Sequence, residues 1–476
     1  MRQDELRLAI ICFFVSCFVL AGSSTAYNLK SLRKTFVSLE SLAPETGAVI
    51  FEMNSGKTIF SSHEHKTFVP ASVAKLITSY TALKELGPDY TFKTEIYVDG
   101  PVVDGKLDGN LYIKGYGDPF LVDEKTWILA KSISSLGLKR LKGDLVIDGS
   151  FFSPLVTKIK IDKNESRPYN AVLSALSVDF NTVTFRIFRS NDSGKRGFVS
   201  VIPSSPYVEL ENSVKVSSKI TYPQVAVTKR RKKGGVGEVF KLSGRIPANG
   251  KPFEVRSNVS FPLLFSGWSI REKLEAVGVK IDGSVVVGKV PEGAGLFTTH
   301  YSPSLREILY GLNRFSNNFM AEMVFRVLGA RLYGPPATVQ KGRRAIETEL
   351  KKLGIKSSEY FIVNGSGLSR EMLVSPFAIR KVLTAVYTDF SIRPEFLASM
   401  ATPRTPGTLK CRFSCYGRTL PVFRAKTGSL NGVVTVAGYT CDSRGRVLGI
   451  VILCNKVGKP WKVKRLLDKV VCLLQQ

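Results

Sequence analysis

Two hydrophobic patterns divide this chain of 476 residues, and their order limits the folds that it can adopt. Around residues 76–83, and through most of the chain after residue 298, apolar residues recur three or four positions apart, which predicts helices. From about residue 92 to 295, short apolar runs alternate with Gly, Asp and Pro turns, which is typical of β-strands. We therefore expect a domain formed by residues 27–91 and 296–476, interrupted by one or two β-rich units within residues 92–295. A hydrophobic content of 44% indicates a globular chain with a substantial core.

The elements expected in each part follow from these patterns and from the turn residues between them. Residues 47–61 predict a β-hairpin around Asn54-Ser55-Gly56, and a helix follows that Gly87-Pro88 ends. The insertion predicts one helix at 124–136 and strands at 94–98, 110–114, 144–148, 183–188, 198–203, 207–211, 220–227 and 284–287. The last part predicts helices at 304–312, 319–332, 339–353, 376–387 and 394–400, and strands at 423–428, 433–440 and 447–454. Residues 461–474 predict a terminal amphipathic helix that packs on the sheet, with a helix on a membrane surface as the alternative.

The sequence at the amino terminus is typical of an export signal. Residues 8–21 form an apolar run that is too short to span a bilayer comfortably, and Ser24-Thr25-Ala26 offers a cleavage site with small residues. We interpret residues 1–26 as a signal peptide, which places the mature protein in the periplasm or otherwise outside the cytoplasm. Arg2 and Arg7 are offset by acidic neighbours, so an uncleaved anchor remains the alternative.

The formal net charge is +29, which favours contact with polyanions such as acidic membranes or wall polymers. The export signal argues against nucleic acid as the natural partner. The densest basic run, Lys229-Arg230-Arg231-Lys232-Lys233, precedes Gly234-Gly235 and predicts an exposed, solvated loop.

The seven cysteines and three histidines do not form a metal-binding pattern. Among the cysteines after the signal segment, the close pair Cys411 and Cys415 is the best candidate for a disulfide in an oxidising compartment. Cys441 and Cys454 are expected to lie far apart along a hairpin. Because no cysteine pair has a histidine nearby, we expect no zinc site, and the sequence indicates no other metal or cofactor.

A short motif at the start of the first helix carries chemistry. Ser72 and Lys75 are spaced so that their side chains share one face of a helix, and Ser72 lies near the positive end of the helix dipole. A buried lysine can lose its proton and act as the base that a serine nucleophile needs. The motif alone is common by chance and equally describes a helix cap beside a solvated lysine. The three histidines lack the setting of a Ser-His-Asp triad, which strengthens Lys75 as the base.

Two further motifs follow in order, Ser316-x-Asn318 and Lys426-Thr427-Gly428. This set resembles the three motifs of the active-site-serine enzymes that recognise penicillin. The resemblance implies that Ser72 attacks a carbonyl, that Lys75 accepts its proton and that Ser316 relays the proton to the leaving amine.

The remaining motif residues are expected to bind the substrate. Asn318 would hold Lys75 and a substrate amide, while Lys426 and Thr427 would hold a terminal carboxylate and Lys426 would lower the pKa of Lys75. Gly428 would let the substrate backbone approach as an added strand. The backbone N–H groups of Ser72 and Ser429 would receive the oxyanion.

Nearly all of the mature chain resembles the low-molecular-mass class C penicillin-binding proteins, the D-alanyl-D-alanine carboxypeptidase/endopeptidases. Ser316 follows Ser72 at a distance of 316 − 72 = 244 residues, which matches the large insertion of that class. The loop Asn364-Gly-Ser-Gly-Leu-Ser-Arg370 is similar to a family loop that begins with Asp, so Asn364 leaves any charge at that position in doubt. Gly117-Asp118-Pro119 and residues 146–150 match turns of the family insertion.

The resemblance implies two more substrate contacts. An acidic residue of the insertion can read the amino group of the stem peptide, and the matching region here is Asn164-Glu165, with Tyr169 nearby. Arg370 is expected to bind a side-chain carboxylate of the substrate. For both Glu165 and Arg370, a surface charge or a structural loop is the competing interpretation.

The expected fold is therefore α+β: a transpeptidase or β-lactamase-like catalytic domain, with an antiparallel sheet covered by helices and inserted β-rich domains. The implied function is removal of terminal D-alanine from peptidoglycan stem peptides through an acyl-enzyme on Ser72, with cross-link endopeptidase activity by the same groups and β-lactams as covalent inhibitors. The alternatives are a β-lactamase or esterase on the same fold, and a basic wall-binding protein with little catalytic activity.

Overall fold

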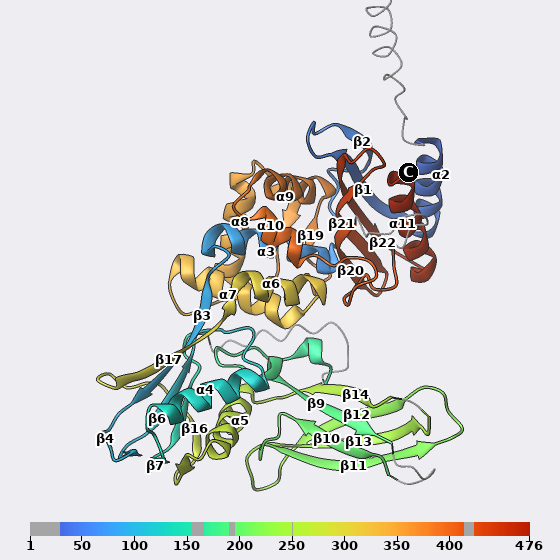
Figure 1. Cartoon of the computed structure of the whole chain (residues 1–476). Helices are drawn as coiled ribbons and strands as arrows, with labels where there is room; N and C mark the ends of the chain where they lie inside the picture. Colours follow the sequence, from blue (N-terminus) through green and yellow to red (C-terminus); the bar gives the residue numbers. More distant parts are fainter. Residues whose placement is uncertain (1–28, 154–165, 190–195, 250, 414–422) are drawn as a thin grey trace, which may run out of the picture.

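The computed structural model describes residues 29–153, 166–189, 196–249, 251–413 and 423–476. In the view of Figure 1, a part built of helices around one sheet lies above a part that is rich in strands. The predicted signal peptide, residues 1–26, lies outside the described residues. None of the helices in the described ranges is long and apolar enough to cross a membrane.

The upper part is organised by a five-stranded antiparallel sheet of order β2-β1-β22-β21-β20. Its strands are β1 (Glu45–Glu52), β2 (Thr58–Ser62), β20 (Arg424–Leu430), β21 (Val433–Cys441) and β22 (Val447–Asn455). Val49 of β1 pairs with Val451 of β22, so strands from the two ends of the chain lie side by side at the centre of the sheet. The predicted hairpins at 47–61 and 433–454 are confirmed.

Helices cover both faces of this sheet because its central strands are apolar on both sides. Alternate residues of β22 point to opposite faces: Ile450 and Ile452 belong to one hydrophobic cluster, and Val451 and Leu453 belong to another. The first face is covered by α2 (Leu29–Leu42) and α11 (Pro460–Leu474), which lie together on the right in Figure 1. The apolar side of α11 is buried against the sheet, which confirms the packing predicted for 461–474.

The opposite face carries the larger group of helices, with α7 in its centre. These helices are α3 (Lys75–Leu86), α6 (Leu305–Arg314), α7 (Asn318–Tyr333), α8 (Val339–Lys352), α9 (Pro376–Thr388) and α10 (Arg393–Ser399). Helix α7 buries nearly its whole length, and α3, α6 and α8 all contact it. A short pair, β18 (Tyr360–Phe361) and β19 (Leu373–Val374), follows η5 (Ser357–Glu359). The predicted helices of this region are confirmed.

The lower part begins and ends on adjacent strands. Strand β3 (Thr91–Val98) leaves the helical part, and β17 (Gly295–Ser304) returns antiparallel beside it. They belong to the sheet β16-β8-β6-β3-β17, flanked by the small sheet β15-β7-β5-β4 and by helices α4 (Asp123–Ser135) and α5 (Pro262–Ala276). The strands are β4 (Val102–Val103), β5 (Lys106–Leu107), β6 (Leu111–Gly115), β7 (Arg140–Leu141), β8 (Leu145–Asp148), β15 (Lys280–Ile281) and β16 (Val285–Val287).

Two three-stranded sheets complete the lower part, with orders β10-β9-β14 and β11-β13-β12. Their strands are β9 (Thr182–Phe188), β10 (Phe198–Ile202), β11 (Val208–Ser217), β12 (Gln224–Arg231), β13 (Glu238–Pro247) and β14 (Phe253–Asn258), preceded by the short turns η3 (Pro168–Asn170) and η4 (Asp179–Asn181). One hydrophobic cluster runs through both these sheets and the sheet of β3, and it includes Ile113, Phe185 and Phe240.

Several predictions about the insertion and the cysteines need correction. Helix α5 was not predicted, and the loop predicted for the basic run 229–233 is only partly correct. Its first three residues end strand β12, whereas Lys232 and Lys233 lie in the turn that follows. The predicted Cys411–Cys415 disulfide is wrong: Cys411 is an exposed free thiol, while Cys472 is disulfide-bonded. Cys415 lies outside the described residues.

Candidate active site

Ser72 and Lys75 lie on a tight turn that leads into a helix. Ser72 belongs to a single 3₁₀ turn, η2 (Ala71–Ala74), and Lys75 is the first residue of α3. In a 3₁₀ turn, side chains three residues apart eclipse one another, whereas in an α-helix they are offset. The turn therefore brings Lys75 Nζ to 2.9 Å from Ser72 Oγ, as the spacing in the sequence predicts.

Lys75 is completely buried and is surrounded by acceptors. Besides Ser72 Oγ, its Nζ contacts Asn318 Oδ1 at 2.6 Å and the Ser366 carbonyl oxygen at 2.7 Å. Burial disfavours the charged amine and lowers the pKa of Lys75 from 10.5 to about 7, although the nearby Glu322 carboxylate opposes this shift. A substantial share of Lys75 is therefore neutral near pH 7 and able to accept the proton of Ser72.

The second and third motifs meet at a second buried lysine. Lys426 Nζ donates to Ser316 Oγ at 2.8 Å and to the Thr427 carbonyl oxygen at 2.8 Å. Its pKa is lowered well below the usual value, first by burial and then by the positive charge of Lys75. Ser316 has a positive φ of 60° at the bend between α6 and α7, and Asn317 caps α7 by accepting from the Met320 N–H. All five residues predicted to be catalytic thus belong to two hydrogen-bonded groups, Ser72-Lys75-Asn318 and Ser316-Lys426.

Gly428 allows strand β20 to lie against the nucleophile turn. A Cβ atom at this position would overlap Thr435 Oγ1 and would lie 2.9 Å from the backbone nitrogen of Ser72. Thr435 in turn donates to the Pro70 carbonyl at 2.8 Å, which ties β21 to the same turn. Gly428 is flanked by the half-buried Thr427 and the exposed Ser429 on the edge strand of the sheet, as predicted.

The loop 364–370 closes the other side of Lys75. Asn364 is buried, accepts from the Gly367 N–H at 2.8 Å and donates to the Leu368 carbonyl at 3.3 Å, so its amide shapes the loop. Gly367 has a φ of +76° and lies so close to Ala71 that a Cβ would overlap the Ala71 carbonyl oxygen. Arg370 is exposed and donates to the Asn431 carbonyl at 3.0 Å, next to the end of β20.

Glu322 is a site residue that the sequence analysis missed. Its Oε1 accepts from the Ser366 N–H at 2.9 Å, and the Ser366 carbonyl accepts from Lys75. The signal that reveals Glu322 is its spacing of four residues from Asn318, which places both on one face of α7. Its contact with Ser366 becomes apparent only in the folded structure, where loop 364–370 packs over that face of α7.

The insertion contributes one wall to a pocket beside this site. Tyr169 and Asn170 of η3 line it, facing Asn318, Glu322 and Ser366 from the helical part. Tyr169 therefore lies near the site, as expected. Glu165 lies outside the described residues, so its predicted contact with the substrate stays a prediction.

Comparison with known proteins finds one family over almost the whole chain. Residues 29–474 match the model of the D-Ala-D-Ala carboxypeptidase 3 (S13) family. A D-alanyl-D-alanine carboxypeptidase DacB from Haemophilus influenzae is 26% identical over 94% of this chain and 93% of its own length. A D-alanyl-D-alanine carboxypeptidase from Actinomadura sp. (strain R39) is 29% identical over 84% of this chain and 76% of its own.

A solved structure shares the fold. The crystal structure of penicillin binding protein 4 (dacB) from Haemophilus influenzae superposes with a TM-score of 0.75 at 25% identity. The match covers 89% of this chain and 93% of the other. The α+β architecture with its insertion is therefore the architecture of a known group of peptidases.

Proposed function

Because the chain belongs to the D-Ala-D-Ala carboxypeptidase 3 (S13) family, we propose that Ser72 is the nucleophile with which it removes terminal D-alanine from peptidoglycan stem peptides. The observation that supports this assignment most strongly is the 2.9 Å contact between Ser72 Oγ and the buried Lys75 Nζ, whose pKa is about 7. A neutral amine at that distance is within reach of the hydroxyl proton that it has to remove.

Acylation proceeds through the two hydrogen-bonded groups. Lys75 takes the proton of Ser72, and Oγ attacks the carbonyl of the penultimate D-alanine. The C–N bond then breaks, and the proton taken up by Lys75 passes through Ser316 to the leaving amine. Water next attacks the ester and gives a proton to Lys75, which returns it to Ser72 Oγ as the ester C–O bond breaks and the shortened peptide leaves. Asn318 holds Lys75 and the substrate amide during both steps.

The substrate is held by strand β20 and by hydrogen bonds from its side chains. Lys426 and Thr427 bind the terminal carboxylate, and Gly428 lets the peptide dock as a strand along the edge of the sheet. The backbone N–H groups of Ser72 and Ser429 stabilise the oxyanion. Arg370 is proposed to bind a carboxylate on the substrate side chain, and Glu165 to read its amino group.

Release of D-alanine from a stem pentapeptide ending in D-Ala-D-Ala tests this function. We expect turnover by the wild-type protein and none by the Ser72→Ala variant, with matched melting temperatures as the control for folding. A folded wild-type protein that releases no D-alanine would overturn the proposal. The same assay with a cross-linked dimer measures endopeptidase activity, and fast turnover of nitrocefin would instead favour the β-lactamase alternative.

The strand order and the hydrophobic clusters support a division of the chain into a catalytic domain and an insertion. We propose that residues 27–91 and 296–476 form the catalytic domain, that 92–295 is the insertion, and that 1–26 directs export to the periplasm or beyond. The central sheet is built from strands of both catalytic segments, whereas one hydrophobic cluster runs through much of the insertion.

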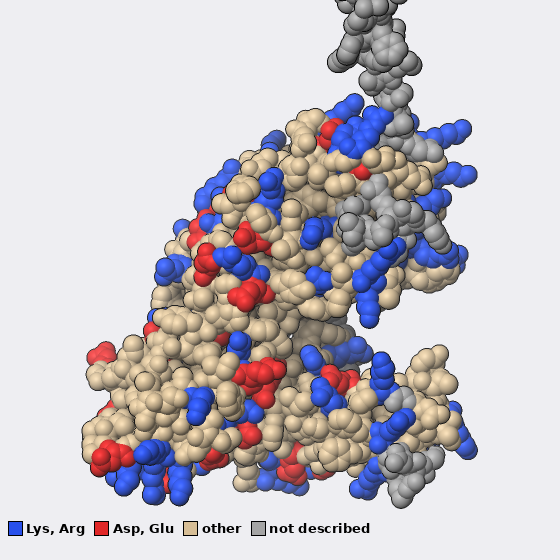
Figure 2. Space-filling view, viewed as in Figure 1, with Lys and Arg blue, Asp and Glu red and all other residues tan. Residues whose placement is uncertain are grey.

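We also propose that the protein contacts anionic membranes peripherally, with wall polymers as the alternative partner. Figure 2 shows Lys and Arg side chains gathered along the right flank, where α2 and α11 lie in Figure 1. Between these helices runs an open groove whose lining includes Leu42, Leu466, Lys462 and Arg465. At its rim, Trp461 is 58% exposed, and an amphipathic ring beside lysines suits a lipid headgroup region.

A further inference from the structure

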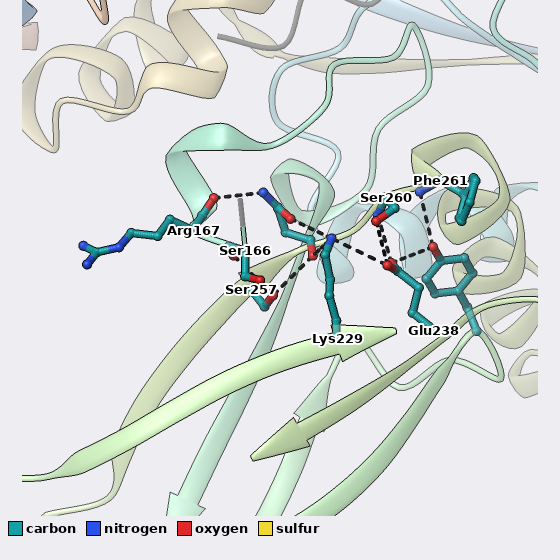
Figure 3. A network of polar contacts seen from close by, with 9 residues as sticks. Ser166, Arg167, Lys229, Glu238, Ser257, Ser260 and Phe261 are labelled. Carbon is teal, nitrogen blue, oxygen red and sulfur yellow. Dashed lines mark hydrogen bonds and ion pairs between the residues drawn. The ribbon is translucent and has the colours of Figure 1, made fainter. Parts of the chain in front are cut away.

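A polar network holds the segment of the insertion that leads into the wall of the active-site pocket, and Figure 3 shows this network. Ser166 and Arg167 lead directly into η3, whose Tyr169 and Asn170 line the pocket. The Ser166 carbonyl accepts from the Asn258 N–H at 3.0 Å, and the Arg167 carbonyl accepts from Asn258 Nδ2 at 3.0 Å. The end of strand β14 therefore holds the segment just before the turn that faces the catalytic residues.

Lys229 sets the orientation of the Asn258 side chain. Its Nζ donates to Asn258 Oδ1 and to the Asn258 carbonyl oxygen, each at 2.8 Å. Because Oδ1 is engaged by the ammonium group, the amide presents Nδ2 to the Arg167 carbonyl. If the amide of Asn258 were rotated, Oδ1 would face the Arg167 carbonyl oxygen. The hydrogen bond between Asn258 and Arg167 would then be lost.

A buried carboxylate completes the network. Glu238 is 2% exposed and accepts from the Tyr207 hydroxyl at 2.8 Å and from Ser260 Oγ at 2.7 Å. Lys229 Nζ lies 3.6 Å from its Oε1, and the lysine side chain is only 13% exposed. Lys229 thus compensates a buried charge and fixes an amide at the same time, unlike the solvated lysine that its basic run predicts.

We propose that Lys229 is a positioning residue for the peptidase reaction, acting through Asn258 and Arg167 to hold Tyr169 and Asn170 against the substrate. This inference rests on the function proposed above. The network touches neither Ser72 nor Lys75, so Lys229 governs how well a long peptide is bound rather than how fast the bond is broken. The relevant substrate is one that extends beyond its two terminal D-alanines into the pocket.

The test compares Lys229→Met with Lys233→Met, which removes the same charge from an exposed position of the same basic run. Two substrates are used: a stem pentapeptide and the truncated N-acetyl-D-Ala-D-Ala. We expect Lys229→Met to raise KM for the pentapeptide about tenfold with little change in kcat, and to change kcat/KM for the truncated substrate less than about twofold. Lys229→Arg should restore much of the loss, and Lys233→Met should match the wild type.

A second variant keeps the test decisive if Lys229→Met does not fold. Asn258→Asp retains an acceptor for Lys229 but removes the donor to Arg167, so it should also raise KM for the pentapeptide alone. Equal losses with both substrates, or pentapeptide kinetics in both variants that match Lys233→Met, would overturn the inference. Failure of the proposed function is distinguishable, because in that case the wild-type protein would turn over neither substrate.

Discussion

At the scale of single residues, the reaction depends on a lysine that is buried and must nevertheless lose its proton. Burial is the larger effect on Lys75 and lowers its pKa to about 7, while Glu322 pulls the pKa upward. Glu322 Oε1 also accepts a hydrogen bond from the Ser366 N–H at 2.9 Å. Glu322 therefore both positions the loop that contacts Lys75 and raises the pKa of Lys75. Because the neutral amine is the active form, acylation should fall as the pH drops below 7.

The first prediction concerns Glu322→Gln, which retains an acceptor for Ser366 but removes the negative charge. In the wild type, kcat/KM should decrease about tenfold per pH unit below a midpoint near 7. Without the opposing charge, the pKa of Lys75 falls further, and the acidic limb of the profile should move to lower pH. The measurement is the pH dependence of kcat/KM, with Glu371→Gln on the exposed surface of the adjacent loop as the control. An unmoved or raised midpoint would contradict this role.

At the scale of elements, the site is formed by close approaches between backbones. The turn η2 is enclosed by β20 at Gly428 and by the loop 364–370 at Gly367, and each approach leaves no room for a Cβ. A side chain at either position would push its element away from Ser72 or Lys75.

The second prediction compares Gly367→Ala with Gly354→Ala. Both glycines have positive φ, at +76° and +70°, so each substitution should cost about 1–2 kcal/mol of stability from backbone strain. Only at Gly367 would the new Cβ overlap the Ala71 carbonyl, since Gly354 has open space around it. We expect acylation by penicillin to fall more than about tenfold in Gly367→Ala and to stay near wild type in Gly354→Ala. Equal acylation rates in the two variants would show that this approach does not position the nucleophile.

Helix period and motif spacing predicted most elements, and each failure has an identifiable physical cause. Helix α5 contains Gly267, a poor helix former, yet a Cβ there would lie 2.5 Å from Val285 and 2.7 Å from Ile147, so the glycine permits close packing of the helix on two strands. Helix α2 (Leu29–Leu42) was not predicted either, because it begins just after the segment interpreted as a signal peptide. The contacts of Lys229 could not be predicted because its partners Glu238 and Asn258 come from other strands, and no local pattern brings them together.

In the active site, too, only contacts within recognisable motifs could be predicted from the sequence. The contacts among Ser72, Lys75 and Asn318 could be predicted because each residue belongs to a motif with a recognisable spacing. The contribution of Glu322, and the approach of η3 from the insertion, depend on the tertiary fold. The spacing from Asn318 places Glu322 on the same face of α7, but no short-range signal shows what Glu322 contacts or that η3 approaches the site.

At the scale of the whole molecule, the large positive charge should favour binding to an anionic membrane most strongly where basic residues lie beside an exposed aromatic ring. The face of α2 and α11 combines Trp461 with Lys462, Arg465 and Lys469, and each basic residue near an anionic surface contributes about 1 kcal/mol.

The third prediction is salt-sensitive binding to vesicles that contain anionic phospholipid, and little binding to neutral vesicles. Replacing Lys462, Arg465 and Lys469 by Gln should weaken binding on the order of a hundredfold. Removing the same charge from the insertion, at Lys139, Lys233 and Lys280, should have a much smaller effect. The measurement is co-sedimentation at two ionic strengths. If both triple variants bind equally, the α2–α11 face is not the contact, and binding only to wall polymer would favour the alternative partner.

Every step of the proposed reaction depends on Ser72 being the nucleophile. The direct measurement is labelling of the purified protein with a fluorescent penicillin, followed by mass spectrometry of the modified peptide, beside a folded Ser72→Ala variant. We predict one adduct per wild-type chain, located on Ser72, and no adduct on the variant. Equal labelling of both proteins would place the reactive group elsewhere, and a folded wild-type protein without any label would contradict the proposed mechanism.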